Sequence, residues 1–248
     1  MPRQARRQSS SGIYHIMLRG INRQTIFEDE EDREKLLETL LHYKEISGYK
    51  LFAYVFMSNH IHLLLKIEQE PLDVVLKRLA GSYVYWYNWK HKRSGHLFQD
   101  RFKSEPIEDD SYFLTVLRYI HQNPVKGGIC KKVADYRYSS YSAYLQENSA
   151  VDTDFCLGMI GREQFVAFNN EYNNDVCVDV QENDFRLTDE EAKKIIEKIS
   201  RCRNSAEFQK LDTAKRDVFL KLCRDSGISI RQLSRLTGIS FNIVRKFG

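Results

Sequence analysis

Several kinds of segment are missing from this chain of 248 residues. No run of about eighteen apolar residues occurs, so no transmembrane helix is expected. Residues 1–11 lack the apolar stretch of a secretory signal. The five cysteines show no C-x-x-C spacing, which argues against a disulfide framework and a structural zinc site and predicts a reducing, cytoplasmic location. Without repeats or low-complexity tracts, a chain of this length should form one large domain or two small ones.

Positive charge is gathered locally, although the net charge is only +4. A single basic cluster is usually a solvated surface, but several clusters that flank histidine and tyrosine motifs favour a polyanionic partner. The candidate phosphate contacts are Arg19, Arg23, Arg101 and Lys103. The wider clusters include Arg3, Arg6, Arg7, Lys90, Lys92, Arg93, Lys126, Lys131, Lys132 and Arg224.

The tripeptide His60-Ile61-His62 lies in an apolar, β-rich stretch, residues 54–65. Because side chains alternate along a strand, both imidazoles should point to one face while Ile61 points into a core. Each neutral ring offers a nitrogen lone pair, so a pair on one rigid face suits a divalent metal. A His-x-His is common by chance, and two ordinary strand residues are the alternative interpretation.

A second motif at residues 119–124 supplies a phenol and an amide. Tyr119 and Asn123 are four residues apart and should share one face of a helix that Pro124 ends. Asn123 is a candidate oxygen ligand, and imidazole with oxygen ligands suits Mg²⁺ or Mn²⁺ better than a closed zinc site. Tyr119 is a candidate nucleophile for phosphorus. A helical tyrosine more often packs, and Tyr112 on nearly the same face is the rival.

Three further features have simpler interpretations. His15 is most simply a strand histidine, with a role near the metal as the less favoured alternative. His121 should point away from the face of Tyr119 and be structural. The aromatic run at residues 83–89 is more typical of helix packing, although the basic residues 90–93 leave room for stacking of single-stranded DNA.

The order of expected elements predicts an α+β fold. Hydrophobic periodicity, caps and turn residues give strand, helix, strand, strand, helix, strand and helix, at residues 12–18, 29–47, 50–57, 60–67, 71–89, 102–108 and 111–123. This is the split βαβ pattern of a ferredoxin-like sandwich with a central antiparallel sheet. Residues 126–147 read as an irregular tail packed on it, so the domain is expected to span residues 1–147.

The rest of the chain changes character. Residues 148–187 read as a loosely helical connector, and residues 188–248 as a helical region that begins with a capping-box-like start at Thr188. Residues 229–245 look like a helix-turn-helix, with Ser229 and Ser240 as N-caps and Gly238 in the turn. Its second helix is short for a recognition helix. Arg231 and Arg235 are candidate DNA contacts there.

The chain combines the two site motifs with two further stretches, residues 12–15 and 95–103. Together they resemble the single-tyrosine transposases of the HUH endonuclease superfamily, and within it the REP-associated tyrosine transposases, over about residues 1–147. The resemblance implies a ferredoxin-like sheet, metal ligands at His60, His62 and Asn123, and a nucleophile at Tyr119. It also implies single-stranded, often hairpin-forming DNA as the substrate, and a monomer or a homodimer.

The activity expected from this resemblance is strand cleavage through a 5′-phosphotyrosine link, with Mg²⁺ or Mn²⁺ as cofactor. Three alternatives remain open at this point. They are a non-catalytic DNA-binding regulator derived from such an enzyme, a replication initiator or relaxase of the same superfamily, and a metal-dependent hydrolase that uses water as its nucleophile.

Overall fold

The chain folds into two compact units, Met1–Asp179 and Val180–Gly248, in a computed structural model. The structure describes residues 6–99, 101–146, 149–175, 177, 187, 189–202 and 204–247. Among these residues, no helix is both long enough and apolar enough to span a bilayer.

A four-stranded sheet forms the centre of the first unit. Its strands are β1 (Ile13–Arg19), β2 (Lys50–Phe56), β3 (His60–Lys66) and β4 (Lys103–Ile107). They are ordered β2-β3-β1-β4, and each neighbouring pair is antiparallel. The inner strands β1 and β3 are buried along nearly their whole length, because both faces of the sheet are covered. The predicted ferredoxin-like α+β fold is confirmed.

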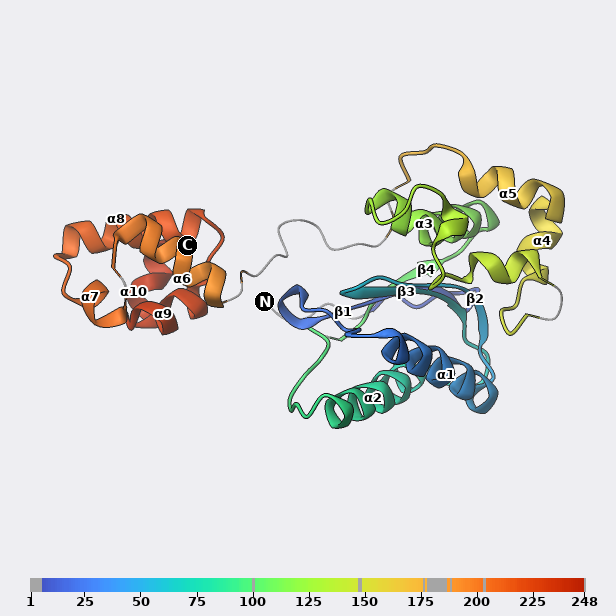
Figure 1. Ribbon diagram of the computed structural model, residues 1–248, viewed down its shortest axis with the longest axis horizontal. Helices are drawn as coiled ribbons and strands as arrows, with labels where there is room; N and C mark the ends of the chain where they lie inside the picture. Colours follow the sequence, from blue (N-terminus) through green and yellow to red (C-terminus); the bar gives the residue numbers. More distant parts are fainter. Residues whose placement is uncertain are drawn as a thin grey trace. The chain divides into compact units, whose positions relative to one another are not determined.

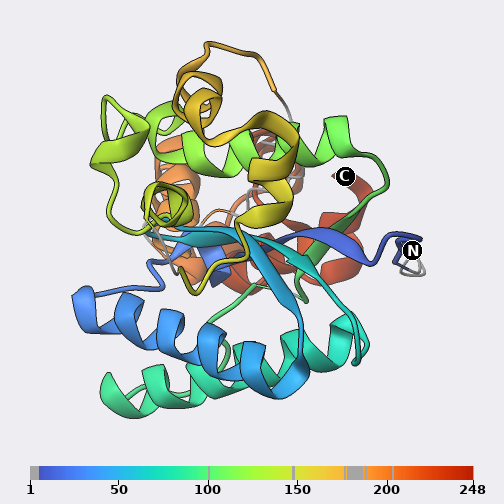
Figure 2. The same ribbon diagram turned by 90° about the vertical axis from the view of Figure 1, so that its right-hand side faces the viewer.

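Three long helices cover the two faces of this sheet. Figure 1 and Figure 2 show α1 (Glu30–Ser47) and α2 (Leu72–Lys90) on one face and α3 (Asp110–Lys126) on the other. Asp29 begins α1 in a capping box with Asp32, and Gly48 ends it in the left-handed region at φ 67°. The Asp109 carboxylate caps α3 by accepting from the Tyr112 amide. These caps fix the bounds of helices that the sequence pattern predicts closely.

The prediction that Pro124 ends the last of these helices is wrong, because α3 continues to Lys126. A proline lacks only its own amide hydrogen, so the carbonyl four residues earlier loses a partner while later amides can still bond. The Gly127 amide donates to the Asn123 carbonyl at 2.8 Å, and the Ile129 amide donates to the Pro124 carbonyl at 2.9 Å. The extra residues bring Lys126 onto the same helix face as Tyr119 and Asn123.

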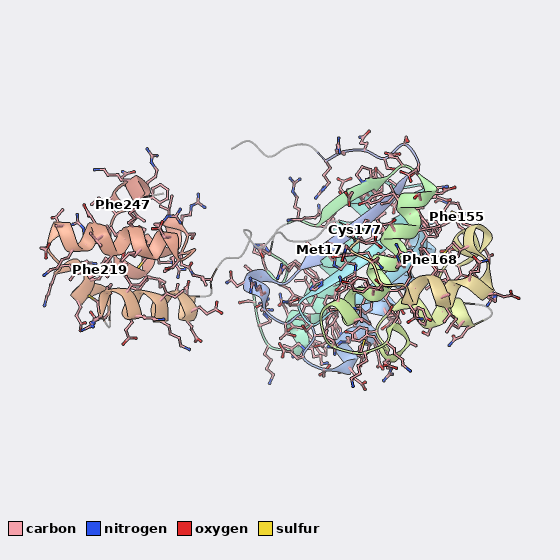
Figure 3. The ribbon with its side chains drawn as sticks, turned by 90° about the horizontal axis from the view of Figure 1, so that it is seen from above. Met17, Phe155, Phe168, Cys177, Phe219 and Phe247 are labelled. Carbon is pink, nitrogen blue, oxygen red and sulfur yellow. The ribbon has the colours of Figure 1, made fainter. Side chains whose placement is uncertain are left out.

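Part of the predicted connector packs onto the first unit. Two short helices, α4 (Asp154–Ile160) and α5 (Arg162–Asn170), lie beside α3 (Figure 1), and Figure 3 labels Phe155 and Phe168 there. Phe165 of α5 is fully buried and stacks on Tyr144, at 4.5 Å between ring centroids. Tyr144 belongs to the irregular tail, which forms two 3-10 turns, Val133–Asp135 and Ser140–Leu145. The predicted end of the ferredoxin-like domain at residue 147 stays a prediction.

The second unit is all-helical. It contains α6 (Asp189–Ser200), α7 (Ser205–Gln209), α8 (Thr213–Asp225), α9 (Ile230–Thr237), α10 (Phe241–Val244) and a final 3-10 turn (Arg245–Phe247). Its core includes Leu220, Cys223, Leu233 and Val244, with Phe219 and Phe247 (Figure 3) packed against it.

The predicted helix-turn-helix corresponds to α9 and α10. Ser229 accepts from the Gln232 amide, and Gly238 turns the chain in the left-handed region at φ 70°. Ser240 precedes α10 but makes no side-chain cap bond. The expected cap at Thr188 lies outside the described residues.

Candidate metal and tyrosine site

Strand register places the predicted histidines on the sheet face that α3 covers. In the β1–β3 pair, Met17 lies opposite His62 and Arg19 lies opposite His60. Side chains on paired residues of neighbouring strands point to the same face, so both histidines face α3 while Ile61 faces α1 and α2. The structure therefore gives the two imidazoles the common face that their spacing predicts.

His60 is joined to Asn123 at the surface end of this face. Its Nδ1 lies 2.7 Å from the Asn59 Oδ1, and its Nε2 lies 3.3 Å from the Asn123 Oδ1. Both partners are amide oxygens, which only accept, so a neutral ring can donate to just one of them; if Nδ1 donates to Asn59, Nε2 keeps a lone pair. That lone pair then faces the lone pairs of Asn123. Two acceptors that converge in this way are the arrangement that a cation stabilises.

His62 is fully buried beside His15. The His15 Nε2 lies 2.9 Å from the His62 Nδ1, while the His62 Nε2 has no hydrogen-bond partner in the described part of the chain. Burial lowers the pKa of His15 to about 3, and burial with the neighbouring His15 and His60 lowers the pKa of His62 well below its usual range. Both rings are therefore neutral, and the orphaned Nε2 of His62 suits a metal ligand.

His15 is the site residue that sequence reasoning undervalued. Its place beside His62 depends on the register of β1 against β3, where His15 lies opposite Leu64. The available signal was a histidine in an otherwise apolar strand, which needs a polar partner. The partner itself is 47 positions away in the sequence, and no local pattern indicates it.

Tyr119 of α3 lies above the histidine pair. Its ring centroid is 5.6 Å from that of His62 and 5.9 Å from that of His15, in edge-on contacts, and its exposed fraction is 5%. The rival Tyr112 lies two turns earlier, and burial and the neighbouring Glu105 raise its pKa. Position therefore favours Tyr119, because Tyr119 and Asn123 approach His60 and His62 from one helix.

Comparisons with known proteins find relatives of the part of the chain that carries these residues. The sequence pattern of the family described as "Transposase IS200 like" matches residues 8–123. This part of the chain belongs to the IS200-like transposase family. A Haemophilus influenzae protein, provisionally described as a REP-associated tyrosine transposase, is 28% identical over 123 residues, which are 45% of this chain and 67% of that protein.

A solved structure shows the same fold. It is described as a REP-associated tyrosine transposase bound to a REP hairpin, and it covers 75% of this chain and 96% of its own, with a TM-score of 0.53 and 16% identity. Within the described residues of the present chain, no group of three or more His, Cys, Asp or Glu side chains could hold a metal. Two imidazoles and an amide oxygen form a different donor set, which the IS200-like domain does bring together.

A loop after α5 fastens onto the helix that carries Tyr119. Arg118 pairs with Glu171 at 2.7 Å and with Asp175 at 2.9 Å, and the Gln122 amide donates to the Asn169 and Glu171 carbonyls at 2.8 Å each. Sequence reasoning missed these contacts because the asparagine-rich residues 169–175 read as connector.

His121 points away from Tyr119, as its position predicts. It bonds to Asn169 and Ser140, both at 2.9 Å, and burial lowers its pKa to about 4. It thereby ties α3 to both α5 and the irregular tail. The interpretation of His121 as structural agrees with these bonds.

The predicted basic contacts lie in different places. Arg19 is opposite His60, and Lys103 is opposite Met17, so both are on the site face of the IS200-like domain. Arg23 and Arg101 are exposed, and Arg101 lines a cavity on the α2 side of the sheet. In the second unit Arg231 is exposed, whereas Arg235 pairs with Asp189 at 2.7 Å. The sequence pattern could not show that Arg235 is engaged inside its own unit.

The aromatic run on α2 has two different sides. Tyr83 and Tyr87 are buried in the core, as expected for helix packing. Tyr85 and Trp89 are 79% and 72% exposed, so these two rings remain available to a partner.

Proposed function

We propose that this chain is a metal-dependent single-stranded DNA endonuclease and strand transferase that forms a 5′-phosphotyrosine intermediate. The observation that supports this most strongly is the orphaned Nε2 of buried His62, on the same face as the contact between His60 and Asn123 and beneath Tyr119. A buried polar atom without a partner is costly and indicates a missing ligand. Membership of the IS200-like transposases supplies the class of reaction.

His60, His62 and Asn123 would hold the metal in this proposal. Neutral imidazole and amide oxygen ligands with open positions suit Mg²⁺ or Mn²⁺. When bound, such an ion polarises the scissile phosphate and offsets charge on its oxygens. The His15 ring would keep the His62 proton on Nδ1, so that the Nε2 lone pair faces the ion.

Tyr119 would attack the scissile phosphorus. The bond from its phenol oxygen to phosphorus forms, the bond from phosphorus to the 3′ oxygen breaks, and that oxygen takes up a proton as the 3′-hydroxyl. A phenol has an ordinary pKa of about 10, so its proton must pass to solvent or another acceptor as the bond forms. The Lys126 ammonium lies 5.4 Å from the Tyr119 ring and would stabilise negative charge developing there.

The covalent link would make the reaction reversible. The phosphotyrosine retains the energy of the phosphodiester, so a second 3′-hydroxyl can attack it and release Tyr119. This is how cleavage becomes strand transfer. Arg19 and Lys103 lie on the same face and would hold the DNA backbone, with an affinity that falls as salt rises.

We also propose hairpin-forming single-stranded DNA as the substrate and a cytoplasmic location. The relative of the same fold is described as bound to a REP hairpin. Arg23, Arg101 and Arg231 are further candidate DNA contacts, because all three are exposed. Arg235 can contact DNA only when DNA displaces it from its ion pair with Asp189. The proposed location rests on the cysteines, which show no C-x-x-C spacing in the sequence.

The deciding experiment is a gel assay for a covalent protein–DNA adduct. Labelled single-stranded hairpin DNA from around the gene would be incubated with the protein and Mn²⁺. The matched variants are Tyr119→Phe and Tyr112→Phe, because both tyrosines lie on α3. We expect an adduct that requires Mn²⁺, that Tyr119→Phe abolishes and that Tyr112→Phe retains, with DNA binding intact in all three proteins.

Other outcomes would overturn the proposal in distinct ways. Cleavage without an adduct would indicate a hydrolase that uses water. An adduct lost in Tyr112→Phe but not in Tyr119→Phe would move the nucleophile. Binding without cleavage or an adduct would indicate a DNA-binding regulator.

A further inference from the structure

A cavity of about 350 Å³ lies on the opposite face of the sheet from the histidines. Its apolar walls come from β1, α2 and the segment before β4, and α2 covers this face in Figure 1. The wall residues used below are Leu18, Ala80, Phe98 and Phe102. The described residues that line the cavity all belong to the first unit, and no histidine or tyrosine of the proposed catalytic site is among them.

The rim of this cavity is built around a stacked cation. The Arg6 guanidinium lies 3.7 Å above the centroid of the Phe102 ring and donates to the Phe102 carbonyl at 3.3 Å. A neighbouring cavity of about 380 Å³ shares Arg6, Phe102 and Asp73 with the first. The Arg6–Phe102 stack therefore lines both cavities, and a ligand in either cavity could contact it.

Charge around the rim is predominantly positive. Among the described residues, Arg6, Lys77 and Arg101 line the first cavity and Arg7 lines the second, against one carboxylate, Asp73. Burial and the nearby Arg101 cation lower the pKa of Arg6, and Asp73 only partly offsets them. Cations that repel one another around an apolar hollow are stabilised by an anion. The complementary ligand therefore has an apolar, flat part and a negative charge.

We propose that this cavity binds one unpaired nucleotide of the single-stranded DNA. The base packs between Phe98 and Phe102, and Arg6 and Arg101 hold its phosphate. Asp73 accepts a hydrogen bond from the base, which favours bases with an exocyclic amino group. This inference rests on the proposed function, since it assigns a second contact for the same DNA.

The position of β4 connects the cavity with the proposed catalytic site. β4 is an edge strand of the sheet. Phe102, just before it, lines the cavity, while the next residue, Lys103, pairs with Met17 on the face of the histidines. A single strand that passes over this edge meets Lys103 between the two sites. The nucleotide in the cavity is therefore near the scissile phosphate along the DNA but on the other face of the protein.

The test uses full-length protein and fluorescence anisotropy with a set of hairpin oligonucleotides. In each oligonucleotide, one unpaired position is replaced by an abasic residue. For the unaltered protein, one position should weaken binding by about 5- to 100-fold, the range expected for loss of one stacked base. In Phe102→Leu, binding of the intact oligonucleotide should weaken by a similar factor, and the abasic penalty at that position should vanish.

Further variants keep the inference falsifiable. Ala80→Phe fills the cavity from α2 and should reproduce Phe102→Leu if that variant fails to fold, as judged by circular dichroism. Val74→Ala trims an exposed apolar side chain on the same helix outside the cavity and should change nothing. Asp73→Asn should alter the preferred base at the sensitive position without affecting the others.

An abasic penalty that persists unchanged in folded Phe102→Leu or Ala80→Phe would overturn the inference. If the unaltered protein binds and cleaves the DNA in that case, the proposed function stands and only the cavity is excluded. If the unaltered protein binds none of the oligonucleotides, the proposed function fails and the inference falls with it.

Discussion

The two units of this chain differ in the burial and pairing of their polar side chains. The first unit buries two neutral imidazoles between a sheet and a helix, and leaves the His62 Nε2 without a partner in the described structure. In the second unit, one of the two expected DNA-contacting residues, Arg235, pairs with Asp189 of the same unit. A buried polar atom without a partner favours a role in chemistry, whereas an exposed ion pair between two helices favours a modest contribution to stability. The comparison favours the first unit as the location of the proposed reaction.

The largest expected effect comes from removing the proposed metal ligand His62. His62→Gln should reduce adduct formation by about a thousandfold or more, because metal polarisation of the phosphate contributes several kcal/mol. Titration of Mn²⁺ by calorimetry should show weakened binding. The matched control is His121→Gln, another fully buried histidine, whose partners are Asn169 and Ser140. Equal loss of Mn²⁺ affinity in both variants would remove the distinction between a ligand and a structural histidine.

Acid should destabilise the first unit more than the second, because all seven histidines lie in the first. Burial lowers the pKa of His121 from 6.5 to about 4, so between these pH values the unfolded chain binds the proton and the folded unit does not. Stability therefore rises with pH across this window and is lost as the pH falls from 6.5 to 4, by about 2–3 kcal/mol. His15, whose pKa is also lowered, acts in the same direction.

Intrinsic fluorescence can follow this loss in one unit alone. Both tryptophans, Trp86 and Trp89, lie in α2 of the first unit, whereas circular dichroism reports the helices of both units. Urea unfolding monitored by fluorescence should shift to lower urea between pH 6.5 and 4. The part of the circular-dichroism signal that belongs to the second unit should shift less. Coincident shifts of both signals would contradict the assignment.

A smaller effect is expected at His15, which is proposed to orient His62. Outer partners of metal-bound histidines typically contribute 10- to 100-fold in metal affinity, and His15→Phe should weaken Mn²⁺ binding by about that factor. His15→Gln places an amide oxygen near the His62 Nδ1 and should recover part of the affinity. Because a role in packing alone would favour phenylalanine over glutamine, better Mn²⁺ binding by His15→Phe would exclude the positioning role.

These experiments concern the residues that sequence could and could not place. The spacing of His60 and His62 predicts a shared strand face, and the four-residue spacing of Tyr119 and Asn123 predicts a shared helix face. Both predictions depend on local periodicity, and the structure shows both. The contact of His15 with His62 and the fastening of residues 169–175 onto α3 depend on strand register and tertiary packing, which local patterns do not contain.

The smallest expected effect is that of Arg235→Ala in the second unit. Arg235 and Asp189 are 62% and 41% exposed, and an exposed pair typically contributes no more than about 1 kcal/mol. The Arg235 guanidinium, with the Gln232 amide, lowers the pKa of Asp189 to about 2, so the stability from this pair is present above pH 3.8 and is lost as the pH falls toward 2. The variant should lose that acid-dependent step in a thermal melt followed by circular dichroism.

In Arg235→Ala, the cleavage rate and the DNA affinity should stay within about twofold of those of the unaltered protein. Arg19→Ala removes a cation opposite His60, so it should weaken DNA binding and reduce the dependence of that binding on salt. An equal loss of DNA affinity in the two variants would mean that DNA displaces Arg235 from Asp189. Asp189 would then compete with DNA for Arg235, and both units, not the first alone, would bind DNA.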